Sequence, residues 1–355
     1  MAPTRKKRAE PAREPSSNSV SMKTLAEYLG VSSATVSLVI NRSPGAKSIP
    51  PATQERVLKA ARDLNYRPNL MARSLRQKRS FTIGVIVPEI SEGYAALVMS
   101  GIEDYLLEEG YFYLVVSHRH RSDLTEEYPL LLQQRAVEGI IAVDTACSEA
   151  CTLPTVAISG HREVAGVTNI VLDHDLAAHL ALEHLQNLGH KNIAFIKGQD
   201  FSSDTETRWR ALHSEANKLG IAIDERLKIQ MTSDSSSPEV GYNVTREIIS
   251  RNVPFTALVA FNDISAIGAI RALRESGRRV PQDVSIIGFD DIQSAAFQNP
   301  SLTTVQQPLR AMGVVGAETL LKRIAACGKG DYPKQIVVEP KLVVRDSTAV
   351  CPACD

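Results

Sequence analysis

The chain has 355 residues, 43% of them hydrophobic, so it is long enough for more than one domain and can bury a substantial core. It contains no apolar run of about eighteen residues or more, which argues against a membrane span. No apolar stretch follows the basic first residues, so we expect no signal peptide and a cytoplasmic protein.

The formal charge of zero hides an uneven distribution. Residues 1–80 hold 16 Lys and Arg against 5 Asp and Glu, a charge of +11, and the remainder therefore carries −11. A basic head on an acidic body predicts that the head binds a polyanion while the body is repelled from it. A disordered basic tail is the alternative reading, but the positive charge continues into patterned sequence as far as Arg79. Nucleic acid is the favoured partner.

Five cysteines are scattered along the chain, an odd number that argues against a disulfide framework in a reducing compartment. Cys351 and Cys354 have the spacing of metal ligands, but two thiolates fill only half of a tetrahedral zinc shell. We therefore expect a loose tail there, with neither a metal nor a cofactor in the protein.

Residues 1–20 are rich in Pro, Ser, Arg and Glu and are predicted to be disordered. Three short helices are predicted in 21–66: Met22–Leu29, a second beginning after Ser32, and Pro51–Leu64. Gly30 can end the first helix and Ser32 can cap the second. Only a tight turn separates these two helices, which is typical of a helix-turn-helix.

From Phe81 onward, short apolar runs alternate with amphipathic helix patterns, several of which end in Gly. The predicted strands are Ile83–Val87, Tyr113–Val116, Gly139–Val143, Thr155–Ile158, Ile193–Ile196, Ala257–Ala260 and Ser285–Gly288. The predicted helices are Tyr94–Glu109, Asp175–Leu188, Thr207–Leu219 and Ile264–Ser276. Continuous apolar strands between helices indicate parallel sheet covered on both faces. The length exceeds one lobe, so the fold class is α/β, with two doubly wound lobes and a cleft behind a small all-α head.

Several motifs in this order resemble those of the LacI/GalR repressor family. Thr24–Ser32, Ala34–Ser37 and Asn41 resemble the family's DNA-binding head, and Leu64–Asn69 with Ala72–Leu75 resemble its hinge helix. Phe261–Asp263, Val280–Asp291 and Leu302–Val305 match further along. The resemblance spans about Met22 to Ser347.

The resemblance implies a homodimer whose heads and hinge helices bind a pseudo-palindromic operator on double-stranded DNA. It also implies a core like that of periplasmic sugar-binding proteins, in which a small-molecule effector changes DNA affinity. The expected domains are a helix-turn-helix at 21–66, a hinge at 67–80, a two-lobed core at 81–347 and a tail at 348–355. Apolar heptads do not follow Ser347, so assembly beyond a dimer is unsupported. Whether the effector releases or strengthens operator binding stays open.

The second helix of a helix-turn-helix enters the major groove. The expected DNA-binding residues of the head are Thr24, Ser32, Ser33, Ala34, Thr35, Ser37, Leu38, Asn41 and Tyr66. Ala34 can contact a thymine methyl, and serines can donate or accept hydrogen bonds. Many members of the family have a long polar side chain at the position of Leu38. Leu38 is expected to be either a base contact or a core residue. Thr35 and Asn41 are expected as phosphate contacts or helix caps.

In the hinge, the resemblance implies DNA contacts by Asn69, Ala72, Arg73, Leu75 and Arg76. Leu75 would wedge between base pairs from the minor groove and kink the operator. Burial of Leu75 against the core is the alternative, but its basic neighbours suit a charged groove better.

Ligands of open α/β sheets gather beyond the carboxyl ends of the strands. The expected effector-binding residues are Pro88, Asp144, Ser159, Arg210, Phe261, Asn262 and Asp290. Of these, Arg210, Asn262 and Asp290 match family effector positions. Arg210 could instead pair only with Glu206. Asp263 could be a helix cap, and Asp291 a surface turn residue.

Three further questions are the chemical class of the effector, whether the protein is an enzyme, and whether it is a transport binding protein. The resemblance implies a small polar effector such as a sugar or a sugar derivative. A loop aromatic of some relatives is missing near Ser236, and Ser159 replaces an acidic residue of some sugar-binding relatives, so the choice between a sugar, a sugar acid and another molecule stays open. An enzyme is disfavoured because phosphate-loop, nucleophile-elbow and paired metal-ligand motifs do not occur, and His118, His120 and His161 lack a partner pattern. A transport binding protein is disfavoured by the basic head.

Overall fold

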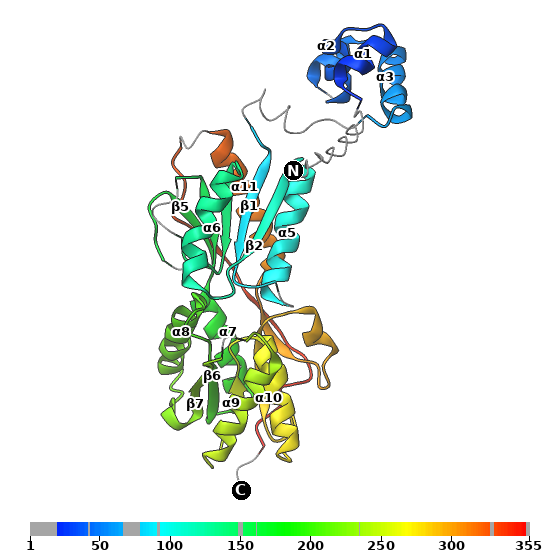
Figure 1. Cartoon of the computed structure of the whole chain (residues 1–355). Helices are drawn as coiled ribbons and strands as arrows, with labels where there is room; N and C mark the ends of the chain where they lie inside the picture. Colours follow the sequence, from blue (N-terminus) through cyan, green and yellow to red (C-terminus); the bar gives the residue numbers. More distant parts are fainter. Residues whose placement is uncertain are drawn as a thin grey trace, which may run out of the picture. The chain divides into compact units, whose positions relative to one another are not determined.

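The computed structural model describes residues 20–41, 43–66, 79–90, 93–147, 152–160, 162–233, 235–326 and 330–352 (Figure 1). The chain divides into two compact units, one ending at Arg79 and the other beginning at Ser80. The first unit is helical, and the second contains two mostly parallel sheets. The predicted fold class is thereby confirmed.

The first unit is a small bundle of short helices. Its elements are α1 (Met22–Leu29), α2 (Ser33–Ile40), the 3-10 helix η1 (Pro44–Ser48) and α3 (Pro51–Asp63). Ser32 caps α2 by accepting a hydrogen bond from the Thr35 N–H at 3.0 Å, and Gly30 ends α1 with a left-handed φ of 65°. Both predictions are confirmed. The core consists of Leu25, Ala26, Val36, Val39, Val57, Ala60 and Ala61.

One lobe of the second unit, here called the N-lobe, has the strand order β11-β5-β4-β3-β1-β2. Its strands are β1 (Thr82–Val87), β2 (Phe112–Ser117), β3 (Gly139–Val143), β4 (Thr155–Ile158), β5 (Val167–Leu172) and β11 (Gln335–Val338). Its helices are α5 (Tyr94–Glu108), α6 (Ser122–Gln134) and α11 (Leu309–Ala325). All neighbouring strands of this sheet are parallel.

The other lobe, the C-lobe, has the order β12-β10-β9-β8-β6-β7, and only β12 is antiparallel. Its strands are β6 (Ile193–Lys197), β7 (Lys228–Gln230), β8 (Ala257–Val259), β9 (Ser285–Asp290), β10 (Thr303–Gln306) and β12 (Lys341–Val343). Its helices are α7 (His174–Asn187), α8 (Asp204–Lys218), α9 (Pro238–Ser250) and α10 (Asp263–Glu275), with 3-10 helices η2 (Glu225–Leu227) and η3 (Gln293–Phe297).

The central apolar strands are buried on both faces because helices cover both sides of each sheet (Figure 1). In β6, Ile193 and Phe195 pack under α7 and α8, whereas Ala194 and Ile196 pack under α9 and α10. In the N-lobe, α5 crosses α11 closely. A Cβ at Gly101 would lie 1.9 Å from the Arg310 carbonyl oxygen, so only glycine permits this approach.

The chain passes between the lobes after β5, after β10 and after β11, since α11 and β11 return to the N-lobe. The strands and helices predicted for the head and the core are all present, with ends that differ by a few residues at most, whereas the expected hinge helix lies outside the described residues. The sequence reasoning missed β5, β7, β10, β11 and β12, and helices α6, α9 and α11. Several of these are short or lie at sheet edges, where the apolar pattern is weak.

The expectation of a loose tail is wrong for its first residues. The Ala349 carbonyl accepts from His190 Nε2 at 3.0 Å, and the Ala349 N–H donates to Ser285 Oγ at 3.0 Å. The Cys351 N–H donates to the Leu188 carbonyl at 2.7 Å, where α7 leaves unpaired carbonyls. Backbone hydrogen bonds of this kind depend little on side-chain type, so the tail's composition did not predict them.

Candidate functional site

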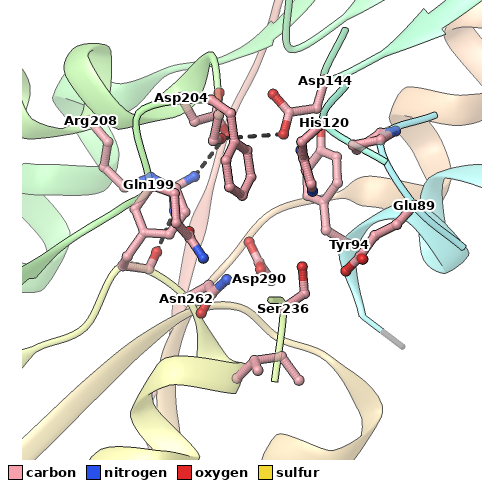
Figure 2. Close-up of a pocket in the computed structure, with 16 residues that line it drawn as sticks. Glu89, Tyr94, His120, Asp144, Gln199, Asp204, Arg208, Ser236, Asn262 and Asp290 are labelled. Carbon is pink, nitrogen blue, oxygen red and sulfur yellow. Dashed lines mark hydrogen bonds and ion pairs between the residues drawn. The ribbon is translucent and has the colours of Figure 1, made fainter. Parts of the chain in front are cut away.

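A pocket lies between the two lobes, beyond the carboxyl ends of the strands. Its volume is about 90 Å³, which is small beside typical ligand sites and suits a compact ligand. The N-lobe contributes Pro88, Glu89, Tyr94, Ala95, His120 and Asp144, and the C-lobe contributes Gln199, Phe201, Ser202, Asp204, Arg208, Ser236, Phe261, Asn262, Ile264 and Asp290. Figure 2 shows the labelled side chains of both lobes facing one another across this space.

Strained backbone marks the edge of this pocket. Asp144 follows β3 with φ 41°, Ser159 follows β4 with φ 56°, and Asp290 ends β9 with φ 106°. Side-chain-bearing residues rarely adopt positive φ, at a cost of about 1–3 kcal/mol each, and such residues cluster at functional sites. The strand ends are therefore shaped to aim these side chains.

Hydrogen bonds join the lobes at the pocket. The Asp144 carboxylate accepts from the Ser203 N–H at 3.0 Å and from the Ser203 hydroxyl at 2.8 Å. The Ser202 hydroxyl also donates to Asp144, at 3.3 Å. Nearby, the rings of His120 and Phe201 pack together with centroids 3.6 Å apart. These contacts close the cleft from one side.

Arg208 is held rigidly in the C-lobe wall. Its guanidinium donates to Asp204 Oδ2 at 3.0 Å and to the Phe261 carbonyl, and it lies over the rings of Phe261 and Phe289 at 4.6 and 4.4 Å from their centroids. Asp204 also lies 3.4 Å from His174 Nε2, at the start of the helix that follows the first passage between lobes. A ligand that contacts Asp204 or Arg208 is thereby connected, through Asp204 and His174, to the segment in which the chain first passes from the N-lobe to the C-lobe.

The base of the pocket is formed by residues at the ends of β8 and β9. Asn262 caps α10 by accepting from the Ser265 N–H at 2.9 Å, and Asp290 accepts from the Gln307 amide at 2.5 Å. Asp263 lies behind them, fully buried, and accepts from Thr304 Oγ1 at 2.6 Å and from the Ile292 N–H at 2.9 Å. Asp263 is thus a buried structural acceptor in this arrangement.

Burial changes the proton affinity of the pocket's acids. It raises the pKa of Asp144 to about 7, with repulsion from Asp204 as the second cause. Burial also raises the pKa of Asp290 to about 7, against the opposing effect of Arg208. The pKa of the Tyr94 hydroxyl lies well above its usual value, first because of burial and then because Asp204 and Asp144 are near. The phenol is therefore a neutral hydrogen-bonding group.

Of the expected effector-binding residues, the structure brings Pro88, Asp144, Phe261, Asn262 and Asp290 together around the pocket. Ser159 is not among the lining residues but contacts one of them, Tyr94. It is buried, and its hydroxyl bonds to the Tyr94 hydroxyl at 2.6 Å. Asp291 is turned away and pairs with Arg345 at 2.6 Å.

The structure does not bring Arg210 to the pocket. Its side chain is exposed and donates to the Glu206 carbonyl at 3.4 Å and to Thr207 Oγ1 at 3.3 Å. The buried face of α8 instead repeats every three or four residues and includes Asp204, Arg208, Leu212 and Glu215. Because 3.6 residues make one turn, Arg210 projects away from that face and Arg208 lies on it. Helical periodicity alone could have identified Arg208.

Sequence reasoning also missed aromatic and polar wall residues, namely Tyr94, His120, Gln199, Phe201 and Ser202. His120 follows β2 and Gln199 follows β6, so the rule of strand ends applies to both. Phe201 stands where the C-lobe meets His120 of the N-lobe, a contact between lobes that no local pattern predicts.

The helical unit presents part of the expected DNA-binding set. Ser33, Ala34 and Thr24 are exposed, whereas Ser37, Thr35 and Tyr66 are half-buried. Asn41 is a cap of α2, because its amide donates to the Ser37 carbonyl at 2.8 Å. Asn69, Ala72, Arg73, Leu75 and Arg76 lie outside the described residues.

Leu38 is half-buried, and its methyl carbons cover Gly45 of η1, where an added Cβ would meet Leu38 Cδ2 at 3.1 Å. Leu38 thus packs on the neighbouring 3-10 helix and keeps part of its surface open. Leu38 therefore remains a candidate for both roles considered from the sequence, a base contact and a core residue.

No cluster of three or more His, Cys, Asp or Glu side chains in the described part of the chain is arranged to hold a metal ion. Among the described residues, no helix combines the length and apolar character that crossing a membrane requires.

Comparison with known proteins identifies the family. Residues 21–69 match the family model of bacterial regulatory proteins, lacI family, and residues 182–348 match that of the periplasmic binding protein-like domain. The HTH-type transcriptional repressor PurR of Haemophilus influenzae is 31% identical over 339 residues, which cover 92% of this chain and 98% of that protein.

Solved structures agree with this relationship. The lac repressor dimer bound to operator and the anti-inducer ONPF superposes with a TM-score of 0.78 at 27% identity, over 93% of this chain and 99% of that one. A LacI transcriptional regulator from Alkaliphilus metalliredigens complexed with D-xylulofuranose gives 0.68 at 30% identity, over 76% and 99%. The chain is a transcriptional regulator and belongs to the lacI family.

Proposed function

We propose that this protein is a repressor that binds a pseudo-palindromic operator as a homodimer and responds to a small polar effector in the cleft between its lobes. The head at 21–66 and the hinge at 67–80 carry the DNA contacts in this proposal. The core at 81–347 carries the effector site and the dimer contacts. The protein would act in the cytoplasm and catalyse no reaction.

The charge and exposure of the head support the DNA contacts. Residues 1–80 carry +11, and the exposed start of α2 offers Ser33 and Ala34 to the major groove. The basic hinge adds Arg73 and Arg76 beside the proposed wedge Leu75. The lac repressor dimer bound to operator is a structural neighbour over 93% of this chain.

One observation carries the effector proposal: polar side chains of both lobes line a single pocket and already bond across it, as Asp144 does with Ser203. A ligand that inserts between them would change the angle between the lobes. Such a ligand shifts the equilibrium between two core states by the difference in its contacts with each. The complex of a 30% identical relative with D-xylulofuranose supports a hydroxylated effector.

The test combines operator selection with ligand screening. The purified full chain is used to select duplexes from random DNA, and the expected product is an inverted repeat. Fluorescence anisotropy of that duplex is then followed during titration with a panel of sugars and polyols. An active ligand should change operator affinity by a factor of about 5–150. Selection of unrelated sequences would contradict operator recognition, and an unresponsive operator complex would contradict the effector site.

A further inference from the structure

The charged side chains that line the pocket are strongly unbalanced. Four are carboxylates, from Glu89, Asp144, Asp204 and Asp290, and one is a guanidinium, from Arg208. The described lining residues include no lysine. The pocket therefore has an excess of acid.

Arg208, the one Lys or Arg among the described lining residues, already has partners in the protein. Arg208 is only 3% exposed, donates to Asp204 at 3.0 Å and lies between two phenyl rings. Its charge offsets that of Asp204. Glu89, Asp144 and Asp290 then face the pocket without a cationic partner among the ion pairs of the described residues.

Burying carboxylates without a counter-charge is unfavourable, because their hydration is lost and they repel one another. Burial raises the pKa values of both Asp144 and Asp290; at Asp290 the attraction of Arg208 opposes the shift, and repulsion from Asp204 and Asp144 adds to it. A cation placed near them would offset that penalty, whereas an anion would increase it.

A second observation indicates an oxygen-bearing ligand. Arg208 Nε is buried and has no hydrogen-bond partner among the described residues, although the other guanidinium nitrogens are engaged. Leaving a buried N–H without an acceptor is unfavourable, because its hydration is lost and no protein acceptor replaces it. A ligand hydroxyl or ring oxygen would satisfy it. The aromatic side chains of Tyr94, Phe201 and Phe261 also line the pocket and supply apolar contact for a sugar ring.

We propose that the effector is a hydroxylated cation, an amino sugar or a closely related amino polyol, whose ammonium group binds beside Asp290 and Asp144 and whose oxygen accepts from Arg208. This inference rests on the proposed function of the cleft as the effector site. It names the chemical class of the ligand and excludes sugar phosphates and sugar acids.

The test uses matched probes with the full-length protein. Glucosamine, galactosamine and mannosamine are each compared by calorimetry at pH 7 with the parent hexose, the N-acetyl derivative and the corresponding uronic acid. In at least one series, the amino sugar should bind at least tenfold more tightly than its neutral relatives, and the uronic acid should not bind. Equal or tighter binding of the neutral sugars, or no binding by any probe, overturns the inference.

Asp290→Asn is the diagnostic variant, because asparagine keeps the acceptor for Gln307 and removes only the charge. The affinity for the amino sugar should fall at least tenfold more than the affinity for the parent hexose. Glu206→Gln is the matched control, since Glu206 is an exposed acid of the same helix as Asp204 and lies outside the pocket. An unchanged preference in Asp290→Asn also overturns the inference.

The operator assay separates this inference from the proposed function. If neutral sugars change operator affinity while amino sugars do not, the cleft is an effector site and the cationic class is wrong. If amino sugars bind the core and leave operator affinity unchanged, the ligand class holds and the proposed regulatory role fails.

Discussion

The Ser203 N–H and hydroxyl donate to the Asp144 carboxylate from the opposite lobe, at 3.0 and 2.8 Å. Asp144 follows β3 of the N-lobe, and Ser203 directly precedes α8 of the C-lobe. The same carboxylate that lines the pocket therefore also holds the lobes together.

Removing this contact should change the response to the effector. Asp144→Ala removes the acceptor of the Ser203 N–H, leaves the Ser203 hydroxyl only the Ser159 carbonyl, and weakens the closed arrangement. We expect a change in effector affinity of about 1–3 kcal/mol, measured by calorimetry with an active ligand. Ser203→Ala keeps the backbone donor and should have a smaller effect. An equal or larger effect of Ser203→Ala would show that the hydroxyl acts elsewhere.

Arg208 and Arg210 form a matched pair on one helix. Arg208→Ala removes the buried guanidinium from the pocket wall and with it the cation paired with Asp204, so the effector response should be lost. Arg210→Ala alters an exposed side chain and should leave the response intact. Operator anisotropy with and without effector measures both, and thermal unfolding checks that Arg208→Ala is folded. Loss of the effector response in Arg210→Ala but not in Arg208→Ala would contradict the placement of Arg208, rather than Arg210, at the pocket.

Asp290 should make stability depend on pH. Burial raises its pKa from 3.8 to about 7, against the attraction of Arg208 and with repulsion from Asp204 and Asp144. Below pH 3.8 the carboxyl is protonated in both folded and unfolded chains. As pH rises towards 7 the unfolded chain ionises first, so the folded state loses stability, by up to about 4 kcal/mol from this group.

The measurement is urea unfolding of the unliganded protein at pH 5 and pH 8, compared with Asp290→Asn. The variant has no group to ionise at this position, so it should lose less stability over this interval than the wild type. A wild-type loss no larger than that of Asp290→Asn would mean that the carboxyl ionises freely in the folded protein.

Salt should weaken DNA binding steeply. A dimer with two heads of this charge would make on the order of ten phosphate contacts, so log affinity against log salt should have a slope of about −9. The slope is measured by anisotropy of the selected duplex between low and physiological salt. Lys59→Ala, in an exposed position of α3, should reduce the slope only if Lys59 contacts phosphate. A nearly flat dependence would remove the electrostatic argument.

Leu38 and Leu75 test the reading of the operator. Leu38→Ala should cost about 1 kcal/mol of head stability through lost contact with Gly45, and should also change operator preference.

Leu75→Ala should weaken specific binding by more than about 1 kcal/mol and reduce DNA bending. Repeat selection, thermal unfolding and a gel bending assay measure these effects. An unbent wild-type complex would contradict the wedge.

The sequence by itself determined the local elements and the class of the protein. Ser32 and Gly30 specify the ends of α2 and α1 because capping depends on neighbouring residues only. The alternation of apolar strands and helices specified parallel sheets, and the strand-end rule located Asp144, Asn262 and Asp290 at the pocket. The charge asymmetry between head and core is likewise a property of the sequence alone.

Only the tertiary structure decided which side chains meet across the lobes. Arg208 rather than Arg210 reaches the pocket because α8 packs one particular face on its sheet. The partnership of Asp144 with Ser203 joins residues 59 positions apart, and no local pattern encodes it. The return of α11 to the N-lobe depends on long-range burial against α5. Such contacts arise from packing of distant segments, for which short-range periodicity carries no information.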